Sequence, residues 1–178
     1  MISDHISGAG RVRQLRRAFD LSFAEAPPTT ETASENLLNI RCGLMPCAFR
    51  VSDISGVFAD VKITRVPTPL PELLGIAAFR GSLLPVYDLH ALLGYAVDTR
   101  PRWLAVAAAT PLGLAFDVLE GQRHVPSDAI VGQRNDDAKL RHVSGIAQLD
   151  GVARPIISVS SLLEQIRTRL RAGTSDKE

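Results

Sequence analysis

The chain has 178 residues and a net charge of +1, with 46% apolar, 22% charged and 5% aromatic residues. This length and composition are typical of a globular protein with one domain or two small ones and a core of its own. The near-neutral charge and the few aromatic rings give no electrostatic or stacking case for nucleic acid or for an anionic membrane.

The N-terminus lacks a basic segment followed by an apolar one, which is the pattern of a secretory signal. No run of about 18 apolar residues is present, so the sequence predicts no membrane-spanning helix. We therefore expect a cytoplasmic protein that does not insert into the membrane.

Residues 1–36 are predicted to form an amphipathic helix followed by a linker. Apolar residues recur at helical spacing from Val12 to Phe23, and arginines crowd the first half of this segment. Pro27 and Pro28 end the helix, and polar residues of linker composition follow. The helix docks on its own domain, forms a partly ordered tail, or binds a partner protein. The arginines are Arg11, Arg13, Arg16 and Arg17.

From residue 37 to about residue 159, the pattern is mostly that of short β-strands separated by turn residues. The segments with a strand pattern are 37–42, 47–51, 57–67, 82–88, 102–110, 112–120 and 142–159. The last of them turns at Asp150-Gly151. Many short strands with few helices favour small barrels or a sandwich, and the crossover helices of a parallel sheet are missing.

Two helices are predicted after the strands begin. Asp88 is expected to cap the short helix 89–93, which Gly94 ends in a left-handed conformation. Ser161 and Glu164 match a capping box that opens a C-terminal helix.

No set of residues has the spacing expected of a catalytic or metal site. The four histidines are scattered, the carboxylates are not paired, and no phosphate-binding loop or nucleophile elbow occurs. We therefore expect no cofactor, whether metal, nucleotide or flavin. Cys42 and Cys47 lie on either side of a predicted hairpin turn, where they either face each other or lie on opposite faces. They are read as small buried side chains or, alternatively, as a redox pair.

The stretch from Phe79 to Gly94 has a different character. Gly81 frees the backbone for a turn, so Arg80 is expected to project from a turn between two structural elements. Such an arginine is either an anchor for a protein partner or the partner of a nearby carboxylate such as Asp88.

Residues 75–94, GIAAFRGSLLPVYDLHALLG, closely resemble the signature of CheW-like domains, the adaptors of bacterial chemosensory arrays. Weaker similarity extends over about residues 37–166. Gly56, Ala78 and Ser158 depart from the family pattern. The signature positions that match are Gly75, Arg80, Gly81, Pro85, Val86, Asp88, Leu89 and Gly94.

The resemblance implies a mainly β fold of two five-stranded, SH3-like barrels side by side, in residues 37–170, with residues 171–178 as a tail. It implies a non-enzymatic adaptor that binds the regulatory domain of a CheA-type histidine kinase and the cytoplasmic tip of a methyl-accepting chemoreceptor. The kinase contact is expected on the first barrel and the receptor contact in the groove between the barrels.

Two sets of site residues follow as expectations. Phe79, Arg80 and Gly81 are expected to bind the receptor at the junction of the barrels. An apolar face is expected to bind the kinase, with Val51, Ile54, Val57 and Phe58 as its members. The alternatives are a β-barrel nucleic-acid-binding protein that uses the N-terminal arginines, and a small thiol or metal enzyme.

Overall fold

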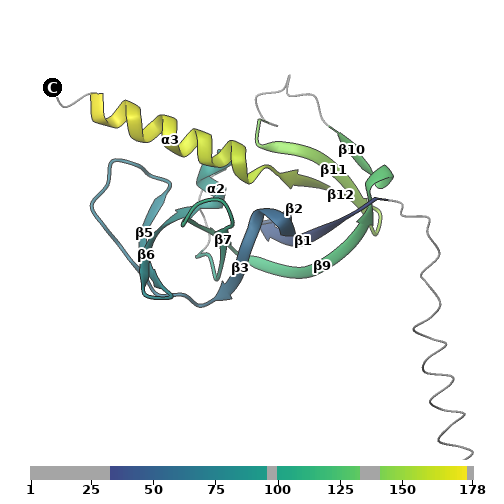
Figure 1. Cartoon of the computed structure of the whole chain (residues 1–178), viewed down its shortest axis with the longest axis horizontal. Coiled ribbons are helices and arrows are strands. Elements are labelled where there is room, and N and C mark those ends of the chain that lie inside the picture. The colour runs from purple at the N-terminus through teal and green to yellow at the C-terminus, as the bar shows by residue number, and fades with distance from the viewer. Residues whose placement is uncertain (1–32, 96–99, 133–140, 176–178) are drawn as a thin grey trace, which may run out of the picture. The chain divides into compact units, whose positions relative to one another are not determined.

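The structure of the chain is a computed structural model that describes residues 33–95, 100–132 and 141–175, with side chains as far as residue 171. The predicted N-terminal helix lies outside the described residues. The described part forms one compact unit, which is mainly β as predicted (Figure 1).

The strands form two six-stranded sheets, named sheet A and sheet B. Sheet A holds β1 (Ser34–Cys42), β2 (Met45–Arg50), β9 (Val118–Pro126), β10 (Ile130–Gly132), β11 (Val143–Leu149) and β12 (Val152–Ile157). Sheet B holds β3 (Ile54–Ala59), β4 (Ile63–Thr64), β5 (Leu73–Phe79), β6 (Ser82–Asp88), β7 (Trp103–Ala107) and β8 (Gly113–Phe116). The helical elements are η1 (Val51–Asp53), α2 (Leu89–Leu92), η2 (Ser127–Ala129) and α3 (Val159–Ser175).

Each sheet is curled, because consecutive strands lie at its two edges. The order is β10-β11-β12-β2-β1-β9 in sheet A and β3-β7-β8-β6-β5-β4 in sheet B. The chain therefore passes from one edge to the other through η2 in sheet A and through residues 60–62 in sheet B. The expected pair of barrel-like sheets side by side is confirmed, with six strands in each where five were expected.

The two sheets repeat one topology, which the sequence analysis did not detect. In each, an antiparallel hairpin is followed by a parallel neighbour, β6 beside β8 and β12 beside β2. The hairpins β5–β6 and β11–β12 also share a sequence pattern. Both have Gly-Ile-Ala from the third residue of the first strand, turn at a glycine in the left-handed region (Gly81 and Gly151), and carry a proline four residues after that glycine.

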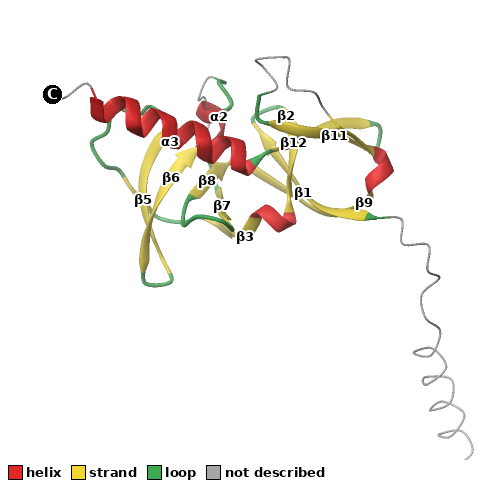
Figure 2. Cartoon of the chain, turned by 45° about the horizontal axis from the view of Figure 1, so that its top comes forward, coloured by secondary structure: helices red, strands yellow, loops and turns green. Residues whose placement is uncertain are grey.

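A shared core joins the sheets. Phe49 of sheet A and Phe116 of sheet B are fully buried, and their rings meet edge to face with centroids 6.3 Å apart. Leu162 and Ile166 of α3 belong to the same buried cluster, and α3 lies over it (Figure 2). Because burial of such large side chains is the main stabilising term, the two sheets fold as one body.

Asp88 caps α2 as predicted. Its Oδ1 atom accepts hydrogen bonds from the backbone N–H groups of His90 (2.8 Å) and Ala91 (3.3 Å). Gly94 follows with φ = +81°, which is the predicted left-handed stop.

The capping box predicted at Ser161 and Glu164 is wrong. Helix α3 begins at Val159, and the side chain of Ser158 accepts the N–H of Ser161 at 3.3 Å. The Ser161 hydroxyl instead contacts the Arg141 carbonyl and the His142 ring. The domain edges also shift, since β1 starts at Ser34 and α3 runs beyond residue 170.

Replacing Asp88 by alanine is expected to destabilise the protein by about 1–2 kcal/mol, because two N–H groups of α2 lose their acceptor. Urea unfolding followed by circular dichroism measures this loss. Asp128→Ala is the matched control, since Asp128 is exposed and no side chain caps η2. Equal destabilisation by both substitutions would contradict the capping role.

Candidate functional site

A hollow lies between the two sheets, where η1 and β3 meet β1 and β9. We call it the junction groove. It is lined by Leu38 and Gln122 from sheet A, and by Val51, Ile54, Ser55, Gly56 and Val57 from η1 and β3. The structure therefore brings three of the four expected kinase-binding residues to the boundary between the sheets.

These three side chains are not equally free. Val51, Ile54 and Val57 are all half-buried. Ile54 and Val57 also pack against the shared core, whereas Val51 is not part of a core cluster. The groove is thus a firm apolar surface in which Val51 is the side chain best able to contact a partner without supporting the fold.

Polar groups at the rim of the junction groove are satisfied within the chain. The Gln122 amide donates to Asn36 Oδ1 at 3.3 Å, and the Ser55 hydroxyl donates to the Val106 carbonyl at 3.2 Å. A partner that buries the groove therefore need not supply hydrogen bonds to these two groups. Apolar burial would dominate its binding energy.

The turn between β5 and β6 has the left-handed geometry expected for it. Arg80 has φ = +46° and Gly81 has φ = +80°, which is typical of the primed turns that join two antiparallel strands. Arg80 is exposed, and its guanidinium lies 5.2 Å from the centre of the Phe79 ring. This distance permits a cation–π interaction that holds the side chain in place.

Phe58 extends this contact into a stack of three residues. Its ring meets Phe79 nearly edge to face, with centroids 4.6 Å apart. A Cβ atom at Gly56 would lie 2.9 Å from the Phe58 ring. The departure from the family pattern at Gly56 therefore leaves the space in which the Phe58–Phe79–Arg80 stack is built.

The stack belongs to sheet B rather than to the junction of the sheets. The hollow beside Arg80 is lined by residues of β3, β5, β6, β7 and the β7–β8 turn, and Leu83 nearby is 67% exposed. The hairpin points away from sheet A (Figure 2). Arg80 was expected between the two barrels, but its contacts lie within sheet B.

Arg80 does not pair with Asp88, which was the alternative structural role. Asp88 is 3% exposed and serves as the cap of α2. No carboxylate within the described ranges forms an ion pair with Arg80. The guanidinium is therefore available to an outside partner.

The two cysteines face each other. Both are buried, and their Sγ atoms lie 3.9 Å apart across the β1–β2 hairpin. The hydrogen bond with Cys47, together with burial, raises the pKa of the Cys42 thiol above its usual value. A thiol held in its neutral form is a poor nucleophile, which favours the structural role for this pair.

A polar contact that the sequence did not reveal ties the sheets together near these cysteines. Asp117 Oδ2 lies 2.8 Å from His90 Nε2 and accepts the Gly43 N–H at 2.5 Å. The β1–β2 turn, α2 and the β8–β9 connection thus converge on one carboxylate. The three residues are far apart in the chain, so no local pattern could have indicated this contact.

Comparison with known proteins supports the resemblance. The chain matches the model of the CheW-like domain over residues 36–167. It is 29% identical over 137 residues to Protein FrzA of Myxococcus xanthus, covering 68% of this chain and 86% of FrzA. Its fold is similar to the crystal structure of the scaffolding protein TtCheW from Thermoanaerobacter tengcongensis, with a TM-score of 0.67 and 21% identity over 73% of this chain and 92% of that chain.

The chain therefore belongs to the CheW-like domain family, as the signature in residues 75–94 predicted. Within the described residues, no helix has the length and apolar character needed to span a membrane.

Proposed function

We propose that this protein is a non-enzymatic adaptor of a bacterial chemosensory array, which couples chemoreceptors to a CheA-type histidine kinase. The observation that carries the proposal is the match to the CheW-like domain over residues 36–167. Because the partners would be a kinase and the cytoplasmic tip of a receptor, the proposal puts the protein in the cytoplasm, at the receptor arrays.

The junction groove is proposed to bind the cytoplasmic tip of the receptor. The family places the receptor contact between its two barrels, and the groove lies at that boundary in this chain. A helix of the receptor tip could lay apolar side chains against Val51, Ile54 and Val57. We therefore assign these three residues to the receptor and no longer to the kinase.

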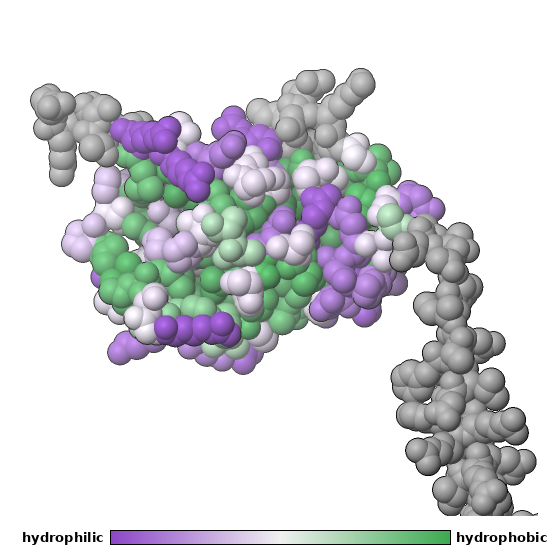
Figure 3. Space-filling view, viewed as in Figure 1, coloured by the Kyte–Doolittle hydropathy of each residue, from purple (hydrophilic) through white to green (hydrophobic). Residues whose placement is uncertain are grey.

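The Phe58–Phe79–Arg80 stack is proposed to take the regulatory domain of the kinase. The stack offers an aromatic surface, a guanidinium held on a fixed turn, and exposed Leu83 beside it. Apolar residues also gather over sheet B in the space-filling view (Figure 3). Aromatic and arginine side chains of this kind are the ones that most often dominate binding energy at protein interfaces.

Replacing Arg80 by alanine is expected to weaken binding of the kinase regulatory domain by about 1–3 kcal/mol, as truncation of an interface arginine does. The melting temperature should change little, because the guanidinium lies over the Phe79 ring and forms no ion pair within the described residues. Isothermal titration calorimetry with the isolated regulatory domain measures the affinity.

Arg123→Ala is the matched control, since Arg123 is an exposed arginine of β9 in the other sheet. It should leave kinase binding unchanged, and neither substitution should affect binding of a receptor fragment. If Arg80→Ala lowers the melting temperature while affinity per folded molecule is intact, Arg80 is an internal strut and the kinase assignment fails.

A further inference from the structure

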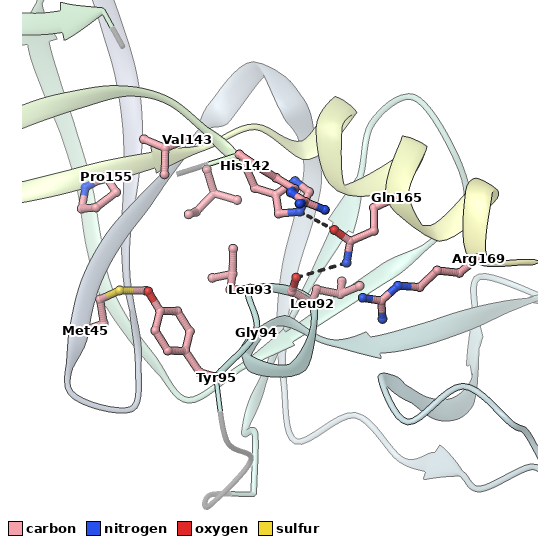
Figure 4. Close-up of a pocket in the computed structure, with 12 residues that line it drawn as sticks. Met45, Leu92, Leu93, Gly94, Tyr95, His142, Val143, Pro155, Gln165 and Arg169 are labelled. Carbon is pink, nitrogen blue, oxygen red and sulfur yellow. Dashed lines mark hydrogen bonds between the residues drawn. The ribbon is translucent and has the colours of Figure 1, made fainter. Parts of the chain in front are cut away.

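A third hollow lies beside α3 and shares no lining residue with the junction groove (Figure 4). We call it the α3 pocket. Its volume is about 230 Å³. Its wall has an apolar part beside α2 and a polar part that includes Arg141, His142, Gln165 and Arg169.

One part of the pocket is apolar. Leu92 and Leu93 come from the end of α2, Val143 from β11, and Ile157 from β12, and the Tyr95 ring stands at the rim, partly exposed. These residues come from α2 and the segment after it, and from sheet A. A ligand seated here would therefore touch α2 on one side and sheet A on the other.

Hydrogen bonds hold the polar side chains of the pocket in place. The Gln165 amide donates to the Leu92 carbonyl at 3.3 Å, so its Oε1 atom faces His142 and accepts from Nε2 at 2.5 Å (Figure 4). Burial lowers the pKa of His142, and the nearby Arg141 and Arg169 lower it further. The imidazole therefore stays neutral at physiological pH and adds no charge to the pocket.

The charge in the α3 pocket comes from two arginines. Arg169 forms an ion pair with Glu72, a carboxylate that is only 1% exposed, at 2.5 Å. Arg141 makes no ion pair with any carboxylate among the residues that the structure describes, although Glu164 lines a neighbouring hollow. The Arg169 guanidinium is paired and the Arg141 guanidinium forms no ion pair within the described residues, so the two arginines give the pocket a positive side.

We propose that the α3 pocket binds a small amphipathic anion, with a compact apolar body and one carboxylate, sulfonate or phosphate group. Arg141 would bind the anionic group through charge-assisted hydrogen bonds, and the apolar part of the pocket would bury the body. The volume lies just below the range of about 300–1,000 Å³ that is usual for drug-sized ligands, which restricts the ligand to a small molecule. This site is independent of the proposed adaptor role.

The probe for this site is 8-anilinonaphthalene-1-sulfonate, which joins an apolar ring system to one sulfonate. Titration of the full chain, followed by fluorescence, should show saturable binding of one probe per chain. Arg141→Ala should weaken it about tenfold or more, which is the effect of losing one charge-assisted hydrogen bond. Tyr95→Ala should also weaken it, because the ring covers the rim of the pocket.

Two controls separate this site from non-specific binding to apolar surface. Arg123→Ala, which removes an exposed arginine that does not line the pocket, should leave the affinity unchanged. N-phenyl-1-naphthylamine, which has the same ring system without the sulfonate, should bind the native chain about as weakly as the sulfonate binds the Arg141→Ala variant. The proposal is overturned if the probe does not saturate, if Arg141→Ala binds it as tightly as the native chain, or if the uncharged compound binds equally well.

Discussion

Substitution of Gly75 by alanine is expected to destabilise the protein severely, by about 3 kcal/mol or more. Gly75 has φ = +146°, a conformation that side chains rarely adopt, and a Cβ atom there would lie 2.1 Å from the Thr64 carbonyl oxygen. The obstacle is backbone, and it belongs to β4, which pairs with β5 at this point. Relief would require the edge of sheet B to separate.

Urea unfolding of the native protein and of the Gly75→Ala variant measures this effect, and Gly81→Ala provides the control. Gly81 also has a positive φ, of +80°, but no atom lies within 4 Å of the added Cβ. Only the cost of the backbone conformation remains there, roughly 1 kcal/mol. Equal losses at the two positions would show that the close approach of β4 to Gly75 is not what requires a glycine.

A charge placed in the junction groove is expected to weaken receptor binding severely. Val51→Asp would put a carboxylate on the apolar groove, where a bound helix would strip it of water without offering a partner. The loss should reach about 100-fold in affinity, since uncompensated burial of a charge at an interface costs several kcal/mol. Binding to the kinase regulatory domain should persist, because the Phe58–Phe79–Arg80 stack is unchanged.

Pull-down or calorimetry with a soluble fragment of the receptor tip measures this loss, alongside a melting curve. Val131→Asp is the matched control, because Val131 is 64% exposed on β10 and lines neither the junction groove nor the α3 pocket. Ile54→Asp should lower stability as well as affinity, because Ile54 packs against the core. Unaltered receptor binding by Val51→Asp would show that the junction groove is not the receptor site.

Local signals in the sequence predicted much of the fold. The β1–β2, β7–β8 and β11–β12 hairpins follow from strand patterns interrupted by turn residues, and the cap at Asp88 follows from an acceptor placed before a short helix. Strands β4 and β10 were not separated out, because two or three residues carry no periodicity. The cap of α3 was misplaced because the hydroxyl of either Ser158 or Ser161 can accept a hydrogen bond from a helix N–H group. Only the path of the backbone decides which of the two serines caps the helix.

The candidate site was less predictable, since its arrangement depends on contacts between distant segments. Val51, Ile54 and Val57 were identified as an apolar set, but their position between the sheets depends on where β1 and β9 pack. Phe58 was grouped with them because it is adjacent in sequence. Its ring instead meets Phe79, a contact that depends on the curl of sheet B, in which β3 and β5 are not hydrogen-bonded neighbours, and on the open space at Gly56.

The central claim is that this chain couples a chemoreceptor to a kinase, and reconstitution tests it most directly. Vesicles that hold a chemoreceptor would be mixed with a CheA-type kinase from the same organism, and kinase autophosphorylation would be measured with and without the full chain. We expect autophosphorylation to respond to the receptor's ligand only when the chain is present, and the response to disappear with Val51→Asp and weaken with Arg80→Ala. A kinase activity that is the same with and without the chain, under conditions where a known adaptor restores control, would contradict the account.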